Sequence, residues 1–236
     1  MAFRDRSQAA DFPPMGWRVI LTSVEPGRLF SDPTAAPIPP QQVARYHGRP
    51  DPVEALARLR AGNARFTSRA AHPGNVFNGG VDAQPYAVVV GCIDARVPVE
   101  TVLGQGIGAI CVARSAGHVL DRAVMGSVEF AVTELQVPLV VVLGHDDCRA
   151  VAAAYEAVRT GRRPAGGRQF LIDQITPAIP AARPIDYNLG KATRSHIHRT
   201  VATLKQAAYL KEALAARRVD VVGAIYRLEN GRIEML

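Results

Sequence analysis

Short runs of uniformly apolar residues recur along the chain, and each is too short to form an amphipathic helix. Their uniform hydrophobicity is typical of strands that are buried on both faces of a parallel sheet. The runs cover residues 87–91, 109–113, 139–143 and 219–226. Asn230 and Gly231 then predict a tight turn, so residues 232–236 are expected to form an antiparallel strand at the edge of the sheet.

Segments with apolar residues at helical spacing separate these runs. The first helix is expected to begin at Pro52, with Asp51 as its cap. Its apolar positions are Val53, Leu56, Ala57, Leu59 and Phe66. Further helices are expected over residues 118–135, from residue 148 to about residue 159, and over residues 192–216.

Strands that alternate with helices predict an α/β domain. We expect a mostly parallel central β-sheet with an antiparallel edge strand, flanked by helices, over residues 51–236. Residues 1–50 are rich in Pro, Ala and Arg and cannot build a core of their own. An N-terminal arm is therefore expected there.

Composition narrows the classes of function. The 28 Lys and Arg against 21 Asp and Glu give a net charge of +7, but the arginines are scattered and form no dense basic tract. We therefore expect no nucleic-acid partner and interpret the charge as solvated surface. No apolar stretch approaches the roughly 18 residues of a membrane span. Nothing near Met1 resembles a signal peptide, so no membrane partner is expected.

Sulfur and imidazole groups stand where two of the predicted strands end. Cys92 follows the first run, and His145 and Cys148 follow the third. Ligand sites of parallel sheets lie beyond the carboxyl ends of the strands, so these side chains are expected to converge. Either cysteine alone would be interpreted as a small buried apolar residue. Together with the histidine they predict one zinc ion per chain with a coordination position left open. Metal-bound thiolates favour a reducing cytoplasm.

Asp94 and Arg96 lie two residues apart, so on an extended segment their side chains share one side. An ordinary surface ion pair is one interpretation. Beside a metal, Asp94 could instead bind the zinc and close the open position, or turn to Arg96 and leave room for water. Since two thiolates offset the charge of the zinc, a bound water should lose its proton less readily than on a three-histidine site. Activity is therefore expected to rise toward alkaline pH.

The pattern resembles that of the β-class carbonic anhydrases, whose motif is Cys-x-Asp-x-Arg followed further along the chain by His-x-x-Cys. Similar segments cover residues 62–66, 114–118, 126–132 and 137–148, and the resemblance extends over residues 51–236. It implies a homodimer or a tetramer with active sites near the interface. It also implies reversible hydration of carbon dioxide to bicarbonate by zinc-bound hydroxide. Cys92, His145 and Cys148 would be the zinc ligands, and Asp94 and Arg96 the catalytic pair that gates the open position.

The expected substrate pocket comprises Gly117, Cys111, Phe130 and Arg149, and three of these depart from the family pattern. Cys111 stands where Phe is common, Phe130 where Tyr is common, and Arg149 where Gly usually follows the second zinc cysteine. Replacement of Phe by Cys111 should enlarge the pocket. Arg149 places a cation at the unfavourable end of a helix. It is therefore expected to pair with one of the aspartates just before it, to contact substrate, or to point to solvent.

Two other functions stay open. The altered pocket could suit another heterocumulene, such as carbonyl sulfide or carbon disulfide, or a larger pathway intermediate. Alternatively, the zinc could be purely structural in a binding or scaffold protein. Among the remaining histidines, His196 and His198 are interpreted as surface or interface residues, and a proton-shuttle role stays open for His118.

Overall fold

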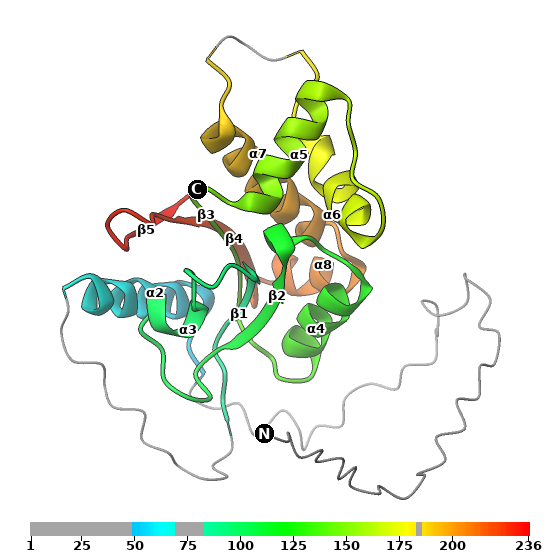
Figure 1. Ribbon diagram of the computed structural model, residues 1–236. Coiled ribbons are helices and arrows are strands. Elements are labelled where there is room, and N and C mark those ends of the chain that lie inside the picture. Colours follow the sequence, from blue (N-terminus) through cyan, green and yellow to red (C-terminus); the bar gives the residue numbers. More distant parts are fainter. Residues whose placement is uncertain (1–48, 69–82, 183–185) are drawn as a thin grey trace, which may run out of the picture. The chain divides into compact units, whose positions relative to one another are not determined.

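The chain folds around one five-stranded sheet in the computed structural model, which describes residues 49–68, 83–182 and 186–236. The strands are β1 (Val88–Cys92), β2 (Cys111–Ser115), β3 (Leu139–His145), β4 (Asp220–Tyr226) and β5 (Ile233–Met235). Their order is β2-β1-β3-β4-β5, with the first four parallel and β5 antiparallel to β4 (Figure 1). The predicted α/β fold and its antiparallel edge strand are confirmed.

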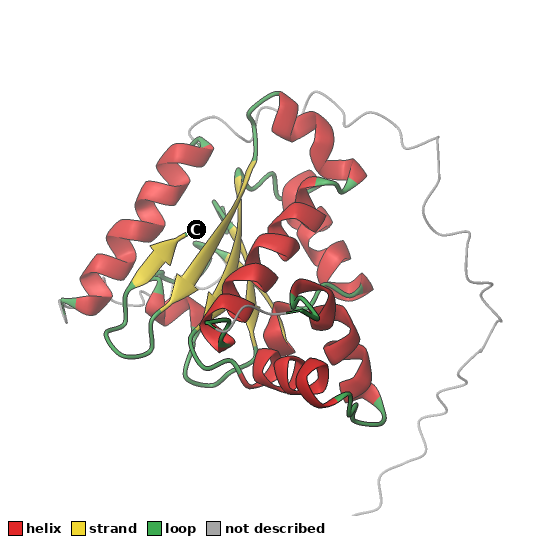
Figure 2. Ribbon diagram, turned by 90° about the horizontal axis from the view of Figure 1, so that it is seen from above, coloured by secondary structure: helices red, strands yellow, loops and turns green. Residues whose placement is uncertain are grey.

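Helices connect the strands and cover both faces of the sheet (Figure 2). They are α2 (Pro52–Thr67), α3 (Val99–Val102), α4 (Arg122–Thr133), α5 (Arg149–Thr160), α6 (Gly167–Ile175), α7 (Leu189–Lys205) and α8 (Ala208–Ala215), with 3-10 turns η2 (Ala116–His118) and η3 (Thr176–Ala178). Alternate residues of a strand point to opposite faces. Val88 and Val90 therefore pack with α4, α7 and α8, whereas Val89 packs with α2 and α3.

The first helix, α2, begins at Pro52 with Asp51 as its cap, as predicted. Its apolar line was wrong at Val53, which is 77% exposed, and at Ala57, which is also exposed. The buried residues are Ala55, Leu59, Gly62 and Asn63. Backbone contacts set this face: a Cβ on Gly62 would lie 2.0 Å from the Leu103 carbonyl oxygen. The Asn63 amide donates to the Val102 carbonyl at 2.8 Å.

The predicted helix over residues 192–216 is in fact two helices, α7 and α8, separated by an extended residue, Ala207. Leu204 and Leu210 are both fully buried in the same core cluster. In an unbroken helix these two side chains would point about 120° apart. The break allows both to face one core. The helix expected from residue 118 begins later, at Arg122, and the sequence reasoning did not identify α3 or α6.

The strand order determines where a ligand site can form. From β1 the chain crosses to β2 on one side, and it later enters β3 on the other side of β1. Connections that diverge in this way leave a crevice beyond the carboxyl ends of the two central strands. Cys92 is the last residue of β1, and His145 is the last residue of β3. Both therefore lie at this crevice.

Two predictions concern regions outside the sheet. Residues 1–48 of the predicted N-terminal arm lie outside the described residues. Among the helices that the structure describes, none combines the length and the hydrophobicity needed to cross a membrane.

Candidate metal centre

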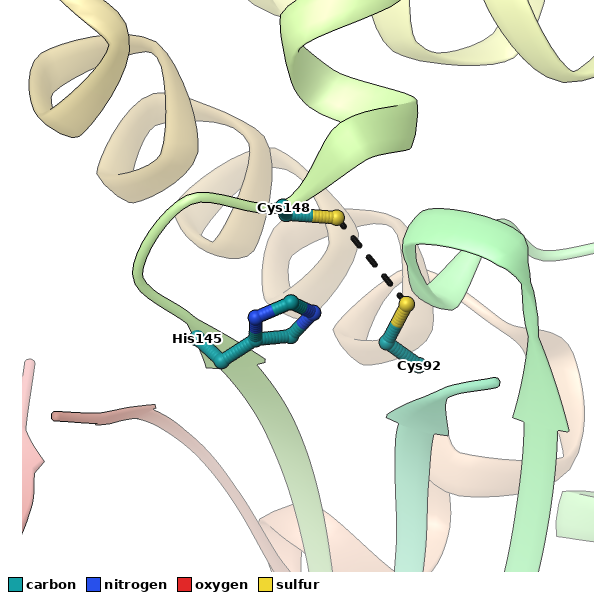
Figure 3. Close-up of side chains that lie close together, drawn as sticks. All are labelled: Cys92, His145 and Cys148. Atoms are coloured by element: carbon teal, nitrogen blue, oxygen red, sulfur yellow. Dashed lines mark hydrogen bonds between the residues drawn. The ribbon is translucent and has the colours of Figure 1, made fainter. Parts of the chain in front are cut away.

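Three side chains from separate elements converge at the carboxyl ends of β1 and β3 (Figure 3). Cys92 ends β1, His145 ends β3, and Cys148 is the residue that caps α5. One ligand atom from each lies within 4.8 Å of the others, and all three side chains are buried. The predicted convergence of these residues is therefore present in the folded chain.

The imidazole of His145 is oriented for metal binding. Its Nδ1 lies 2.7 Å from the backbone carbonyl oxygen of Asp146. A carbonyl oxygen only accepts hydrogen bonds, so Nδ1 carries the proton and Nε2 keeps its lone pair. Nε2 is buried and has no hydrogen-bond partner among the described residues. Metal-ligating histidines commonly use the same backbone contact to fix the ring.

The two sulfur atoms of the site form a hydrogen-bonded pair. Cys92 and Cys148 lie 3.9 Å apart and form no disulfide. The hydrogen bond between the two sulfurs, together with the one from the Gly117 N–H, outweighs burial and lowers the pKa of Cys92. The same hydrogen bond, with burial, raises the pKa of Cys148. The two sulfurs therefore lie close enough to share one hydrogen bond, and either can donate it.

This donor set fits zinc. Two sulfurs and one imidazole nitrogen are soft and borderline ligands that select zinc over magnesium or calcium. Three protein ligands leave a fourth tetrahedral position for water or substrate. The unpartnered Nε2 of His145 would otherwise be a buried polar atom without compensation.

Asp94 is turned toward Arg96. Its Oδ1 accepts hydrogen bonds from the Arg96 backbone N–H at 2.9 Å and from Nε at 3.0 Å, while Oδ2 accepts from Nη2 at 2.8 Å. These hydrogen bonds lower the pKa of Asp94. Oδ2 lies 4.0 Å from Nε2 of His145. Of the two orientations expected for Asp94, this is the one that leaves room beside the ligands.

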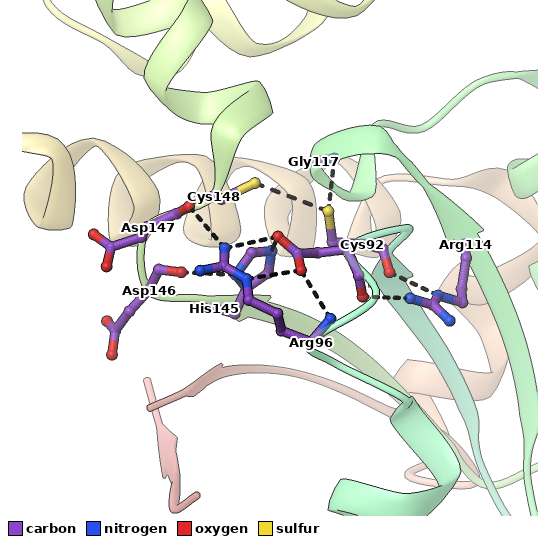
Figure 4. Close-up of polar contacts among 9 residues, drawn as sticks. Cys92, Arg96, Arg114, Gly117, His145, Asp146, Asp147 and Cys148 are labelled. Carbon is purple, nitrogen blue, oxygen red and sulfur yellow. Dashed lines mark hydrogen bonds and ion pairs between the residues drawn. The ribbon is translucent and has the colours of Figure 1, made fainter. Parts of the chain in front are cut away.

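Two further arginines hold the loops that carry these side chains. Arg114 of β2 donates from Nε to the Cys92 carbonyl at 2.7 Å and from Nη2 to the Asp94 carbonyl at 2.8 Å (Figure 4). Arg227, just after β4, donates to Asp146 Oδ1 at 2.8 Å. Sequence reasoning assigned neither residue a role. Arg114 had a usable signal, since it is a charged residue at the end of an otherwise apolar run.

The four residues expected to form the substrate pocket do not lie together within a single chain. Arg149 is exposed and lines the hollow beside the ligands. It forms no hydrogen bond or ion pair with the aspartates before it, and Asp146 is paired with Arg227 instead. Gly117 donates its N–H to the Cys92 sulfur at 3.3 Å. Cys111 and Phe130 line a separate hollow between β2 and α4, where Phe130 is 55% exposed.

The prediction that His196 lies at the surface or at an interface was wrong. His196 is 3% exposed, and its ring contacts the ring of His118 at a tilt of 31°, with centroids 4.4 Å apart. His118 is fully buried. His198 is exposed on the other side of α7, as helical geometry requires for a residue two positions on.

Comparison with known proteins shows the family of the chain. The family model for carbonic anhydrase matches residues 87–233. The chain belongs to the β-class carbonic anhydrases. This is a family of zinc lyases, so the predicted resemblance and enzyme class are confirmed.

Relatives cover most of the described domain. Carbonic anhydrase 2 of Mycobacterium tuberculosis is 40% identical over 189 residues, which cover 77% of this chain and 91% of that protein. The carbonic anhydrase of Mycolicibacterium smegmatis is 40% identical over 192 residues, which cover 78% and 93% respectively. One of two tetrameric β-carbonic anhydrases of Sordaria macrospora shares the fold, with a TM-score of 0.60 and 23% identity over 78% of this chain and 95% of that one.

Proposed function

We propose that the protein catalyses the reversible hydration of carbon dioxide to bicarbonate with one zinc ion per chain, held by Cys92, His145 and Cys148. The observation that supports this most directly is the buried Nε2 of His145, which has no hydrogen-bond partner among the described residues. It lies beside two cysteine sulfurs at the crevice between β1 and β3. Relatives that are 40% identical bear the name carbonic anhydrase.

The bound zinc would supply Lewis acidity, which lowers the pKa of water, although less beside two thiolates than beside three histidines. The protein supplies orientation. Asp94 is fixed by Arg96, so a carboxylate lone pair that Arg96 does not use can accept a hydrogen bond from the attacking water. Water then adds to the carbon of carbon dioxide and gives bicarbonate and a proton. Because contacts with Arg96 lower the pKa of Asp94, this carboxylate stays an acceptor throughout the neutral range.

The hollow beside Cys92 suits both carbon dioxide and bicarbonate. Its lining includes Ile93, Ala95, Ala116 and Ala150, which give apolar surface for carbon dioxide. Arg149 at the same hollow provides a cation that attracts bicarbonate. We assign Arg149 to the substrate pocket on this basis, and Gly117 through its contact with Cys92.

We also propose a homodimer, which could assemble further into a tetramer. The exposed Phe130, with Cys111 beside it, offers apolar surface away from the ligands of its own chain. In a dimer these two residues would contribute to the substrate pocket across the interface. A reducing compartment suits the thiolate ligands, so we place the protein in the cytoplasm.

Metal analysis and stopped-flow hydration of carbon dioxide test the proposal. The purified protein should hold stoichiometric zinc and should hydrate carbon dioxide. Cys148→Ser should lose both, whereas Cys111→Ser, which alters the remaining cysteine, should keep its zinc. Protein without zinc would refute the proposed centre. Zinc-loaded protein that turns over only carbonyl sulfide or carbon disulfide would favour the alternative substrate class, and zinc without turnover would favour a scaffold.

A further inference from the structure

The backbone of Gly117 connects a zinc ligand to a buried histidine. Its N–H donates to the sulfur of Cys92 at 3.3 Å, and its carbonyl oxygen lies 2.8 Å from Nε2 of His196 (Figure 4 shows the first of these contacts). The ring nitrogen that faces a carbonyl must carry the proton, so His196 is the donor. Hydrogen bonds to the backbone of Gly117 therefore connect His196 of α7 with the sulfur of Cys92.

The turn around Gly117 needs this support because its backbone is strained. Gly117 has φ 67° and the next residue, His118, has φ 47°, so two consecutive residues adopt the left-handed region. That region costs a non-glycine residue about 1 kcal/mol or more. Space is also short, since a Cβ on Gly117 would lie 3.0 Å from both Ala150 and Ile175 side chains. The position and direction of the Gly117 N–H thus depend on contacts from outside the turn.

His196 makes two such contacts. Its Nε2 donates to the Gly117 carbonyl, and its ring contacts the ring of His118 at a tilt of 31°, with centroids 4.4 Å apart. Burial lowers the pKa of His196 to about 4, so the ring is neutral and donates from a single nitrogen near neutral pH. An apolar side chain could fill the same space, but it would leave the Gly117 carbonyl without its donor.

We propose that His196 is a positioning residue for the metal centre. By holding the Gly117 carbonyl, it directs the Gly117 N–H at the Cys92 sulfur, where the hydrogen bond stabilises thiolate charge and fixes the sulfur in place. This inference rests on the proposed zinc site. It adds that the strength with which Cys92 holds the metal is set from α7, through a residue that touches neither metal nor substrate.

The test compares metal release in four variants of the full chain. His196→Leu removes the donor, and His196→Gln places an amide N–H near the position of Nε2. His196→Asn keeps a similar amide, but its shorter side chain does not reach the Gly117 carbonyl. Ile197→Val, a conservative change at the next residue of the same buried helix, controls for packing. Zinc release is followed with a chromogenic chelator, and the sulfur-to-metal absorption band is recorded after substitution with cobalt(II).

His196→Leu and His196→Asn should release zinc about 10-fold faster than the wild type, as expected when support behind a metal ligand is lost. Their cobalt absorption band should shift in energy, because the Cys92 sulfur loses part of its hydrogen bond. His196→Gln should resemble the wild type in both measurements, and so should Ile197→Val.

Two outcomes would overturn the proposal. One is release from His196→Leu and His196→Asn at the rate of Ile197→Val, and the other is release from His196→Gln as fast as from His196→Asn. If His196→Leu does not fold, the comparison of Gln with Asn decides the question alone. Wild-type protein that binds neither zinc nor cobalt would instead refute the proposed function, so the two failures are distinguishable.

Discussion

A single methyl group added at Gly144 tests how tightly α7 is packed against β3. Gly144 precedes His145 on β3, and a Cβ there would lie 2.5 Å from Cδ1 and 2.8 Å from Cγ1 of Ile197. On the neighbouring strand β4, a Cβ on Gly223 would lie 2.9 Å from Cγ2 of the same residue. The fully buried Ile197 side chain therefore lies across two glycines, and neither position has room for a methyl group.

The cost of Gly144→Ala follows from these distances. Ordinary van der Waals contacts begin near 3.4 Å, so Ile197 would have to move by roughly an ångström. Overpacking of this kind costs about 1–3 kcal/mol. Alanine recovers about 0.4–1 kcal/mol by restricting the unfolded chain. The free energy of unfolding should therefore fall by about 1–2 kcal/mol, which corresponds to a melting temperature lower by about 2–8 °C for a chain of this size.

Urea unfolding at fixed protein concentration measures the effect. Gly167→Ala is the matched control, because Gly167 begins α6, is exposed and has no heavy atom within 4 Å of an added Cβ. It should be neutral or slightly stabilising. In an Ile197→Ala background, which removes the atoms that clash, Gly144→Ala should cost nothing further. A stabilising effect of Gly144→Ala, or an equal cost in both backgrounds, would refute the reasoning.

Three further predictions concern the site itself. Asp94→Asn should lower turnover about 10²–10³-fold while zinc content is retained, because a fixed charged acceptor is lost; unchanged turnover in a stopped-flow assay would refute its gating role. Arg149→Gln should raise KM for bicarbonate about 2–5-fold at low salt with little change for carbon dioxide, because the pocket loses a cation; equal changes for both substrates would contradict this, and Arg149→Lys is the control. Burial lowers the pKa of His196 to about 4, whereas in the unfolded chain it is about 6.5. The unfolded state therefore binds the proton first as pH falls, and stability is lost from about pH 6.5 down toward 4. Between pH 7 and 5, urea unfolding should show the wild type losing about 2 kcal/mol more than His196→Gln; equal losses would contradict it.

The sequence determines the strands more clearly than the helices, for a physical reason. Most positions in the strands of a doubly covered sheet are apolar, so four short and mainly apolar runs predicted four parallel strands. The sequence of a helix shows which positions are apolar, but tertiary packing decides which of these positions face the core. For α2 the close backbone approach at Gly62 selects the face and leaves Val53 in solvent. For α7 and α8 the break follows from the need to bury both Leu204 and Leu210 in one cluster.

The candidate site shows the same contrast between features that the local sequence reveals and features that depend on packing. Cys92, His145 and Cys148 could be found because each is a chemically distinctive residue at the end of an apolar run. His196 could not, because it is one residue of an amphipathic pattern, and only the folded chain brings it to Gly117 across 79 positions. Cys111 and Phe130 were grouped with the ligands by family resemblance, yet in one chain they line another hollow. The position of His196 beside Gly117 therefore leaves no local signal in the sequence.

The parallel strands contribute to the centre from their carboxyl ends, and arginines from the two flanking strands hold it on either side. The two middle strands supply Cys92 and His145, while Arg114 of β2 and Arg227 after β4 approach from either side. Each of these arginines donates a hydrogen bond to the segment beside one of the two residues. Arg114 donates to the carbonyl of Cys92, and Arg227 donates to Asp146, whose own carbonyl orients His145. Arginine suits this task because its planar fork donates several hydrogen bonds at fixed angles. The sheet therefore holds the segments that carry Cys92 and His145 from both sides.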